Sequence, residues 1–208
     1  MTARLRPVAE QAATAAPARV PRPWAGDDEP AGARWDPLRE EPGPGAARCL
    51  ALYAKLASGV TVVTARGEDG PLGMTVSAAT SVSARPPLLL ACLRDGSRTL
   101  GAVRAFGAFA VHLLREEQRD LAARFASPTT PAAQRFAGTD TCDVLGVPVF
   151  TKSLAWSVCL VEDVRRYGDH HLVVGRVAAV HVGAGRPLLW HDRGFRSLAG
   201  APAADGAG

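Results

Sequence analysis

The chain has little lysine, few aromatic residues and no long apolar run. Only Lys55 and Lys152 are lysines among its 24 basic residues, and aromatic side chains make up 6% of its 208 residues. No stretch approaches the ~18–20 consecutive apolar residues of a membrane-spanning helix. No compact apolar run and cleavage site follow Arg4 and Arg6, so a secretory signal is not indicated. We therefore expect a cytoplasmic protein without a membrane span.

Cysteine is also sparse, and its spacing excludes two common uses. The four cysteines are far apart and form no C-x-x-C pair: Cys49, Cys92, Cys142 and Cys159. This disfavours a disulfide framework and a zinc ribbon. We interpret them as free buried thiols, with Cys92 and Cys159 in apolar strands.

The charge balance does not favour a nucleic-acid binder. The net charge is +4 and the isoelectric point is about 9.2. Such a binder needs its positive charge on one face with interleaved aromatic residues, and here acidic residues lie among the arginines. We therefore expect no nucleic-acid partner, although an OB-like barrel binding single strands stays an alternative. A basic balance also attracts phosphorylated small molecules.

Several familiar catalytic motifs are missing. No G-x-G-x-x-G follows a strand and opens a helix, and no Walker A sequence, G-x-S-x-G or H-E-x-x-H occurs. His170 and His171 are adjacent, and neighbours on a strand point to opposite faces, so they make a poor metal pair. We expect no metal site, and no Ser–His–Asp set is singled out.

Composition divides the chain into three parts. Residues 1–45 hold eight of the 16 prolines and almost no large aliphatic side chains, which predicts a disordered extension. Trp24 and Trp35 could dock there on the domain or on a second subunit. Residues 46–199 form the predicted domain, and residues 200–208 form a flexible tail.

Hydrophobic periodicity predicts mostly strands within the domain. A first helix begins near Ala46 and ends before residues 58–59, and further helical patterns cover residues 97–106, 116–126 and 134–138. Period-two or apolar runs predict strands at residues 59–66, 72–83, 87–93, 109–114, 154–166 and 170–182, with a last strand or pair at 187–191 and 195–198. Strands with short turns and few helices indicate an antiparallel barrel rather than a parallel sheet.

Three features carry candidate chemistry. The strand 72–83 is rich in hydroxyls, with Thr75 and Ser77 on one face, and these either bond internally or pair with a polar heterocycle. Ser97 suits the N-cap of the second helix, and a helix N-terminus with an arginine nearby binds phosphate well. Gly168-Asp169-His170 reads as a hairpin tip with a titratable imidazole.

Together these segments resemble the short-chain flavin reductases, which have the FMN-binding split barrel fold. The strongest stretch is G-M-T-V-S-A-A-T-S-V-S-A-R-P-P-L-L-L-A-C-L at 73–93, and G-D-H-H-L-V-V-G-R-V at 168–177 and the G-F-R-S-L end at 194–198 agree in order and spacing. One departure is His112, where the family commonly has Asn.

The resemblance implies roles for individual residues. Flavin-binding positions would be Gly73, Met74, Thr75, Val76, Ser77, Ala78, Cys92, Leu93, Ser97, Arg98, Thr99, Arg124 and Phe125. His170 would lie by the nicotinamide and flavin rings as the catalytic position. Arg193 and Phe195 would lie near the dinucleotide pocket.

The resemblance also implies a fold and an activity. We expect a mainly β, six-stranded antiparallel Greek-key split barrel with peripheral helices, assembled as a homodimer. The implied reaction transfers hydride from NAD(P)H to FMN or FAD and supplies reduced flavin to a separate oxygenase or halogenase. A non-catalytic flavin- or haem-binding barrel, serving as a sensor or storage module, is the alternative. The sequence leaves FMN against FAD and NADH against NADPH open.

Overall fold

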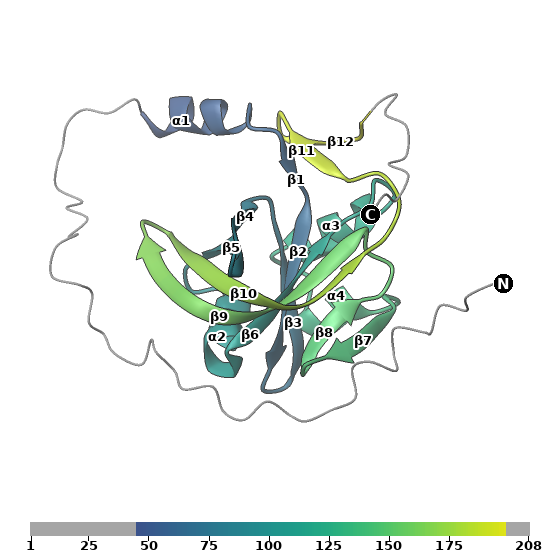
Figure 1. Ribbon diagram of the computed structural model, residues 1–208. Coiled ribbons are helices and arrows are strands. Elements are labelled where there is room, and N and C mark those ends of the chain that lie inside the picture. The colour runs from purple at the N-terminus through teal and green to yellow at the C-terminus, as the bar shows by residue number, and fades with distance from the viewer. Residues whose placement is uncertain (1–44, 199–208) are drawn as a thin grey trace, which may run out of the picture.

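The computed structural model describes residues 45–198 (Figure 1). The predicted extension at 1–45, with Trp24 and Trp35, and the predicted tail at 200–208 lie outside these residues, apart from Gly45. The helices are α1 (Ala46–Tyr53), α2 (Arg98–Phe106), α3 (Arg119–Ala126) and α4 (Ala132–Phe136). The strands are β1 (Ser58–Gly59), β2 (Thr61–Gly67), β3 (Gly70–Val76), β4 (Ala79–Ala84), β5 (Pro87–Arg94), β6 (Ala108–Leu113), β7 (Thr141–Val144), β8 (Val147–Phe150), β9 (Ala155–Tyr167), β10 (His170–Val182), β11 (Leu189–His191) and β12 (Gly194–Arg196).

The main sheet is antiparallel and closes on itself. Its strand order is β3-β2-β6-β9-β10-β5-β4, so β3 and β4 lie at opposite edges. These two edge strands are consecutive in the chain and are separated only by Ser77 and Ala78. A sheet whose two edges are joined by two residues has to curl into a barrel, and β3 also contacts β5 across the closure.

This closure corrects the prediction of one continuous strand at 72–83. The strand breaks at Ser77 and Ala78, both exposed, so Ser77 does not continue the face of Thr75. The Thr61 hydroxyl donates to the Val76 carbonyl at 2.6 Å, while Cys92 N donates to the Ala78 carbonyl at 2.9 Å. The chain thus leaves β2 and joins β5 within two residues. The break also raises the strand number of the main sheet from the expected six to seven.

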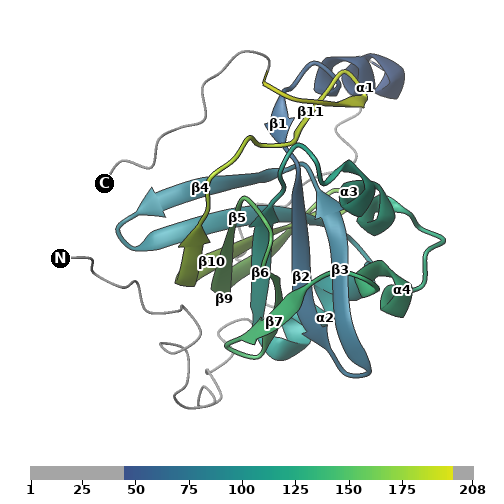
Figure 2. The same ribbon diagram turned by 90° about the vertical axis from the view of Figure 1, so that its right-hand side faces the viewer.

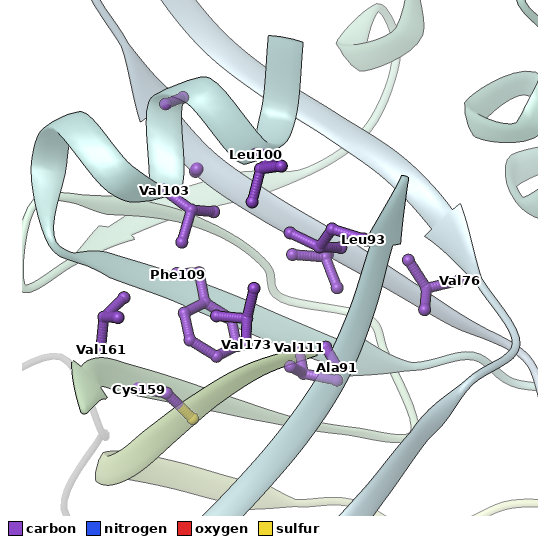
Figure 3. Close-up of a cluster of buried hydrophobic side chains, with 13 residues drawn as sticks. Val76, Ala91, Leu93, Leu100, Val103, Phe109, Val111, Cys159, Val161 and Val173 are labelled. Atoms are coloured by element: carbon purple, nitrogen blue, oxygen red, sulfur yellow. The ribbon is translucent and has the colours of Figure 1, made fainter. Parts of the chain in front are cut away.

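The barrel interior is filled by apolar side chains from almost every strand of this sheet. Phe109, Leu93 and Val173 are completely buried there, and Leu100 and Val103 of α2 point toward them from above (Figure 3). The helix begins where predicted, because the Ser97 side chain accepts a hydrogen bond from Leu100 N at 3.2 Å. Helix α2 therefore closes one end of the barrel.

The long hairpin of β9 and β10 turns at Gly168, as the sequence predicts. The pairing of β10 with β9 shifts after Val174 and again after Val177, yet the more buried positions of β10 stay on one face, at the odd-numbered residues from His171 to His181. Val180 and Val182 lie on the opposite face and are 64% and 77% exposed. The β7–β8 hairpin was missed, and α3 begins at Arg119, later than expected.

Helix α1 projects from the barrel together with the small sheet of β1, β11 and β12 (Figure 1). The helix lies close to where it was predicted, yet it buries no residue of its own. Leu50, Leu52 and Tyr53 are all more than half exposed. No helix among residues 45–198 has the length and apolar content to cross a membrane.

A histidine lies in the apolar interior beside the barrel. His112 is completely buried, its Nδ1 donates to the Val62 carbonyl at 2.9 Å, and its ring packs on Phe150 at 4.3 Å between centroids. Nε2 has no hydrogen-bond partner. Burial lowers the pKa of His112 from 6.5 to about 4, against the smaller opposing effect of the Val62 bond. The imidazole therefore stays neutral in the folded protein.

This burial predicts a loss of stability in weak acid. A histidine with a lowered folded pKa contributes its stability fully above the unfolded pKa, and loses it as the pH falls from 6.5 toward about 4. Between about pH 7.5 and pH 5 this one group should cost ~2 kcal/mol. In urea unfolding at the two pH values, His112→Asn should lower stability at neutral pH but show a shallower acid loss. An equal acid loss in both proteins would contradict the assignment.

Candidate functional site

The main cavity has a volume of about 620 Å³ and lies beside the closure of the barrel. Its walls come from β3, from the loop between β5 and α2, and from the end of α3 with the segment leading into α4. Helices α3 and α4 lie along β3 on this side (Figure 2). The lining residues are Leu72, Gly73, Met74, Thr75, Arg94, Asp95, Gly96, Ser97, Arg98, Thr99, Phe125, Ala126, Ser127, Pro128, Thr129, Thr130, Pro131, Ala132 and Arg135.

One wall of the cavity is the start of α2. The first-turn amides of a helix have no partner inside the helix, and its positive dipole end favours an anion. Ser97 accepts from Leu100 N, and its hydroxyl hydrogen is left to donate into the cavity. Arg98 and Thr99 follow on the same wall, and Thr99 is 4% exposed. The predicted phosphate-binding segment thus faces a cavity.

The opposite wall is β3 with Phe125 behind it. A Cβ at Gly73 would lie 2.8 Å from the Phe125 ring, so only glycine lets the strand pass this close. The Thr75 hydroxyl donates to the Ala122 carbonyl of α3 at 2.6 Å. The sequence left two roles open for the hydroxyls of this strand, internal hydrogen bonding or pairing with a ligand. Thr75 forms an internal hydrogen bond. Gly73 and Met74 line the cavity beside it.

Arg135 is a lining residue that sequence reasoning missed. Its guanidinium donates to the carbonyls of Gly73 at 2.9 Å, Ser127 at 2.7 Å and Thr130 at 3.1 Å. It therefore joins the 127–131 loop to β3. The signal was present, because Arg135-Phe136 repeats the Arg124-Phe125 pair, but only the first pair was interpreted.

Arg124 lies differently from Arg135. Its guanidinium donates at 2.8 Å to the Ala137 carbonyl and at 2.8 Å to the Thr139 hydroxyl, and it does not line the cavity. In this chain Arg124 fixes the segment after α4, while its neighbour Phe125 forms the cavity wall.

His170 lies at the exposed tip of the β9–β10 hairpin. It pairs across the sheet with Arg94, a lining residue, so the two side chains share one face. His170 Nδ1 donates to Asp169 Oδ1 at 2.9 Å, and this bond lowers the pKa of the Asp169 carboxyl. The imidazole is held beside the cavity rather than in its wall.

The sequence predicts that His171 points to the face opposite His170 and tolerates replacement by Ala better, but the structure buries its side chain. It is 3% exposed, and burial together with the positive charges of Arg104 and Arg166 lowers its pKa. Its Nδ1 has no hydrogen-bond partner and lies 3.6 Å from Asp95 Oδ1. His171 is therefore no tolerant control for its neighbour.

The remaining predicted positions lie near the cavity without lining it. Val76 and Leu93 point into the barrel core, whereas Ser77 and Ala78 are exposed at the closure. The side chains of Val76 and Leu93 are therefore closed to a ligand, which could reach only the backbone of these two residues.

The C-terminal pair lies in the small sheet and does not line the cavity. Arg193 occupies the β11–β12 turn with a φ of 57°, and Phe195 packs on Trp190 at 5.2 Å between centroids. The dinucleotide role of these two residues stays a prediction.

The thiols match the sequence interpretation in part. Cys92 is half-buried and Cys159 is completely buried, and burial raises the pKa of Cys159 to about 11. Cys142 is exposed, contrary to the expectation of burial. Neither Cys92 nor Cys159 forms a disulfide.

The donors around the cavity suit a flat ligand with a phosphate group. Arg94, Arg98, Arg135 and the α2 amides supply positive charge and N–H donors, while Phe125 and Met74 supply apolar surface. Phosphate, ribityl hydroxyls and the isoalloxazine of a flavin fit this set. Across residues 45–198, no group of three His, Cys, Asp or Glu side chains could hold a metal ion.

The chain belongs to the family described as the flavin reductase like domain, whose profile matches residues 53–199. The predicted family is thereby confirmed. The chain is 39% identical over 142 residues to an NADH:FMN oxidoreductase of Rhodococcus erythropolis, covering 65% of this chain and 72% of that one. It is 38% identical over 162 residues to the actinorhodin polyketide dimerase of Streptomyces coelicolor, covering 74% and 90%.

Solved structures agree with this fold. An NADH:FAD oxidoreductase of Streptomyces globisporus C-1027, in complex with NAD and FAD fragments, superposes with a TM-score of 0.69 at 30% identity, over 76% of this chain and 94% of that one. The flavin reductase component of a bacterial two-component tryptophan halogenase gives 0.67 at 32% identity, over 73% and 98%. The prediction of a mainly β antiparallel split barrel is confirmed.

Some relatives are much longer than the matched region. The chain is 41% and 39% identical to two proteins of Rhizobium meliloti, one of them the reductase subunit of stachydrine N-demethylase, but it spans only 40% and 55% of their lengths.

The substitution Ser97→Ala tests whether the start of α2 binds the flavin phosphate. Ser97→Ala removes the cap and should cost about 1 kcal/mol of folding stability. It also removes a donor to a charged phosphate, worth roughly 1.5–3 kcal/mol, so the Kd for FMN should rise about ten-fold or more. Riboflavin lacks the phosphate, and its Kd, measured by fluorescence titration, should hardly change. Equal weakening of both flavins would show that Ser97 does not contact phosphate.

Proposed function

We propose that this protein is an NAD(P)H:flavin oxidoreductase. The observation that carries the proposal is the 620 Å³ cavity, which joins an anion-binding helix start to an apolar wall in a flavin reductase-like domain. The NADH:FMN and NADH:FAD oxidoreductases among its relatives support the same activity.

Bound flavin would supply the electron acceptor, since NAD(P)H, oxidised flavin and a proton give NAD(P)+ and reduced flavin. This chain's residues bind and orient the reactants. Ser97, Thr99 and Arg98 hold the phosphate, and the β3 backbone at Gly73 and Met74 holds the ring edge. Phe125 and the segment that Arg135 fixes keep water from the rings. No protein nucleophile takes part.

We also propose a separate oxygenase or halogenase as the recipient of reduced flavin. Relatives described as reductase components include those of a 4-nitrophenol monooxygenase from Rhodococcus opacus and of a tryptophan halogenase.

The main rival is a flavin-binding barrel that does not turn over. Steady-state oxidation of NADH and NADPH with added FMN, FAD or riboflavin separates the two functions. Turnover with at least one pair is expected. A protein that binds flavin and oxidises neither dinucleotide would be a sensor or storage module. The absorption spectrum of the purified protein would show whether flavin is retained.

We further propose that the chain forms a homodimer. Along β10, pairing with β5 ends at Arg176, so residues 177–182 have no strand on that side within the described part of the chain. Val180 and Val182 are exposed on this segment. An apolar strand edge of this kind is normally covered, and a second copy is the commonest cover.

The dimer predicts a mutational effect on mass. The wild-type chain should sediment at twice its monomer mass of 21.7 kDa. Val182→Glu places a charge on the β10 edge and should shift the protein to monomer. Ala133→Glu, on the exposed surface of α4, should leave the mass unchanged. A wild-type monomer at micromolar concentration would refute the dimer.

His170 is expected to position the nicotinamide. Hydride transfer needs the reacting atoms within about 3–3.5 Å, so His170→Ala should lower kcat/KM for NAD(P)H roughly ten-fold or more while the Kd for oxidised flavin changes little. Asp69→Ala, at the exposed tip of the β2–β3 hairpin and outside the cavity lining, is the control. Rapid-reaction measurements of flavin reduction by NADH, compared between His170→Ala and wild type, test this prediction. A wild-type rate at every NADH concentration would mean that His170 only shapes the turn.

A further inference from the structure

Asp95 is unexpected among the residues that line the cavity. The other charged lining residues are Arg94, Arg98 and Arg135, and Asp95 is the one carboxylate with them. A carboxylate in an anion-binding cavity opposes the phosphate, because it lowers the local positive potential. The Asp95 carboxylate therefore does not serve to bind the flavin phosphate, and its other contacts indicate its role.

The contacts of Asp95 lead out of the cavity to the β9–β10 hairpin. Its Oδ2 lies 3.1 Å from Arg166 Nη2 of β9, and its backbone N–H donates to the Asp169 carbonyl at 2.9 Å. Its Oδ1 accepts from Gly96 N at 3.0 Å and lies 3.6 Å from His171 Nδ1 of β10. One residue thus touches both strands of the hairpin and the turn between them.

The partners of Asp95 brace the same turn. Arg166 Nε donates to the Gly168 carbonyl at 3.2 Å, so its guanidinium joins the turn to the Asp95 carboxylate. The buried Nδ1 of His171 faces that carboxylate with no other partner. Residues 167–170 are themselves exposed, so these contacts, together with the pairing of β10 with β5, hold the tip.

We propose that Asp95 is a positioning residue that locks the hairpin tip to the loop before α2. Through this lock, the phosphate-binding start of α2 and His170 keep a fixed separation. The role rests on the proposed reductase function, in which the two regions hold the two reactants. Each contact is weak alone, because exposed ion pairs contribute little, but together they fix the turn from three directions.

If Asp95 locks the hairpin tip, Asp95→Asn should impair the reaction with NADH but should not weaken the binding of FMN. The isosteric amide loses the charge that faces Arg166, so kcat/KM for NADH should fall about ten-fold. The FMN Kd should stay within about two-fold or become tighter, since a negative charge leaves the anion site. A merely structural loss would weaken both ligands together.

The matched control is Asp163→Asn. Asp163 also pairs with an arginine of the same hairpin, Arg165 at 2.7 Å, but does not line the cavity. Asp163→Asn should change neither the kcat/KM for NADH nor the Kd for FMN. Arg166→Gln breaks the same lock from the other side, and should reproduce the NADH effect even if Asp95→Asn folds poorly. Combined with Asp95→Asn, it should add little further loss.

Hydrogen exchange tests the lock without turnover. Amides at 168–171 should exchange faster in Asp95→Asn and Arg166→Gln than in wild type or Asp163→Asn. Unchanged exchange, or equal weakening of FMN and NADH, would overturn the proposal. If the wild-type protein oxidises no dinucleotide, the reductase function fails, and the exchange comparison still decides whether the lock exists.

Discussion

The structure depends on one constraint of chain length. The two edge strands of the main sheet, β3 and β4, are joined by only Ser77 and Ala78, so the sheet cannot lie open. Curling brings β3 against β5 and creates an interior that Phe109, Leu93 and Val173 fill. Close packing inside leaves little space there, so the usable cavity lies outside the barrel, at its closure.

The closure of the barrel also determines which residues line the cavity. Residues after β5 begin α2 on one side, and β3 with its covering helices forms the other side. A helix start with arginines therefore faces an apolar strand wall across a distance set by the barrel. The resulting surface is charged at one end and flat at the other, which is the chemistry that a flavin phosphate and its ring system present.

Buried polar groups near the site are held by carbonyls more than by charges. Thr75 and Thr61 donate to backbone carbonyls, and all three assigned bonds of Arg135 go to carbonyls. Such bonds fix strands and loops in register without adding charge beside an anionic ligand. His112 follows the same pattern, and its unpaired Nε2 makes it costly to protonate.

The sequence by itself determined the family, most strands and helices, and the residues at the start of α2. These depend on local signals: strand and helix periodicity, the cap at Ser97, the turn at Gly168 and short motifs. Tertiary structure alone decided the break at Ser77, the exposure of Val180 and Val182 on β10, and the burial of His171. It also decided that Arg135 rather than Arg124 lines the cavity, and that Asp95 reaches the hairpin. These outcomes depend on how the sheet closes and which elements then pack together, which brings together residues that no local pattern relates.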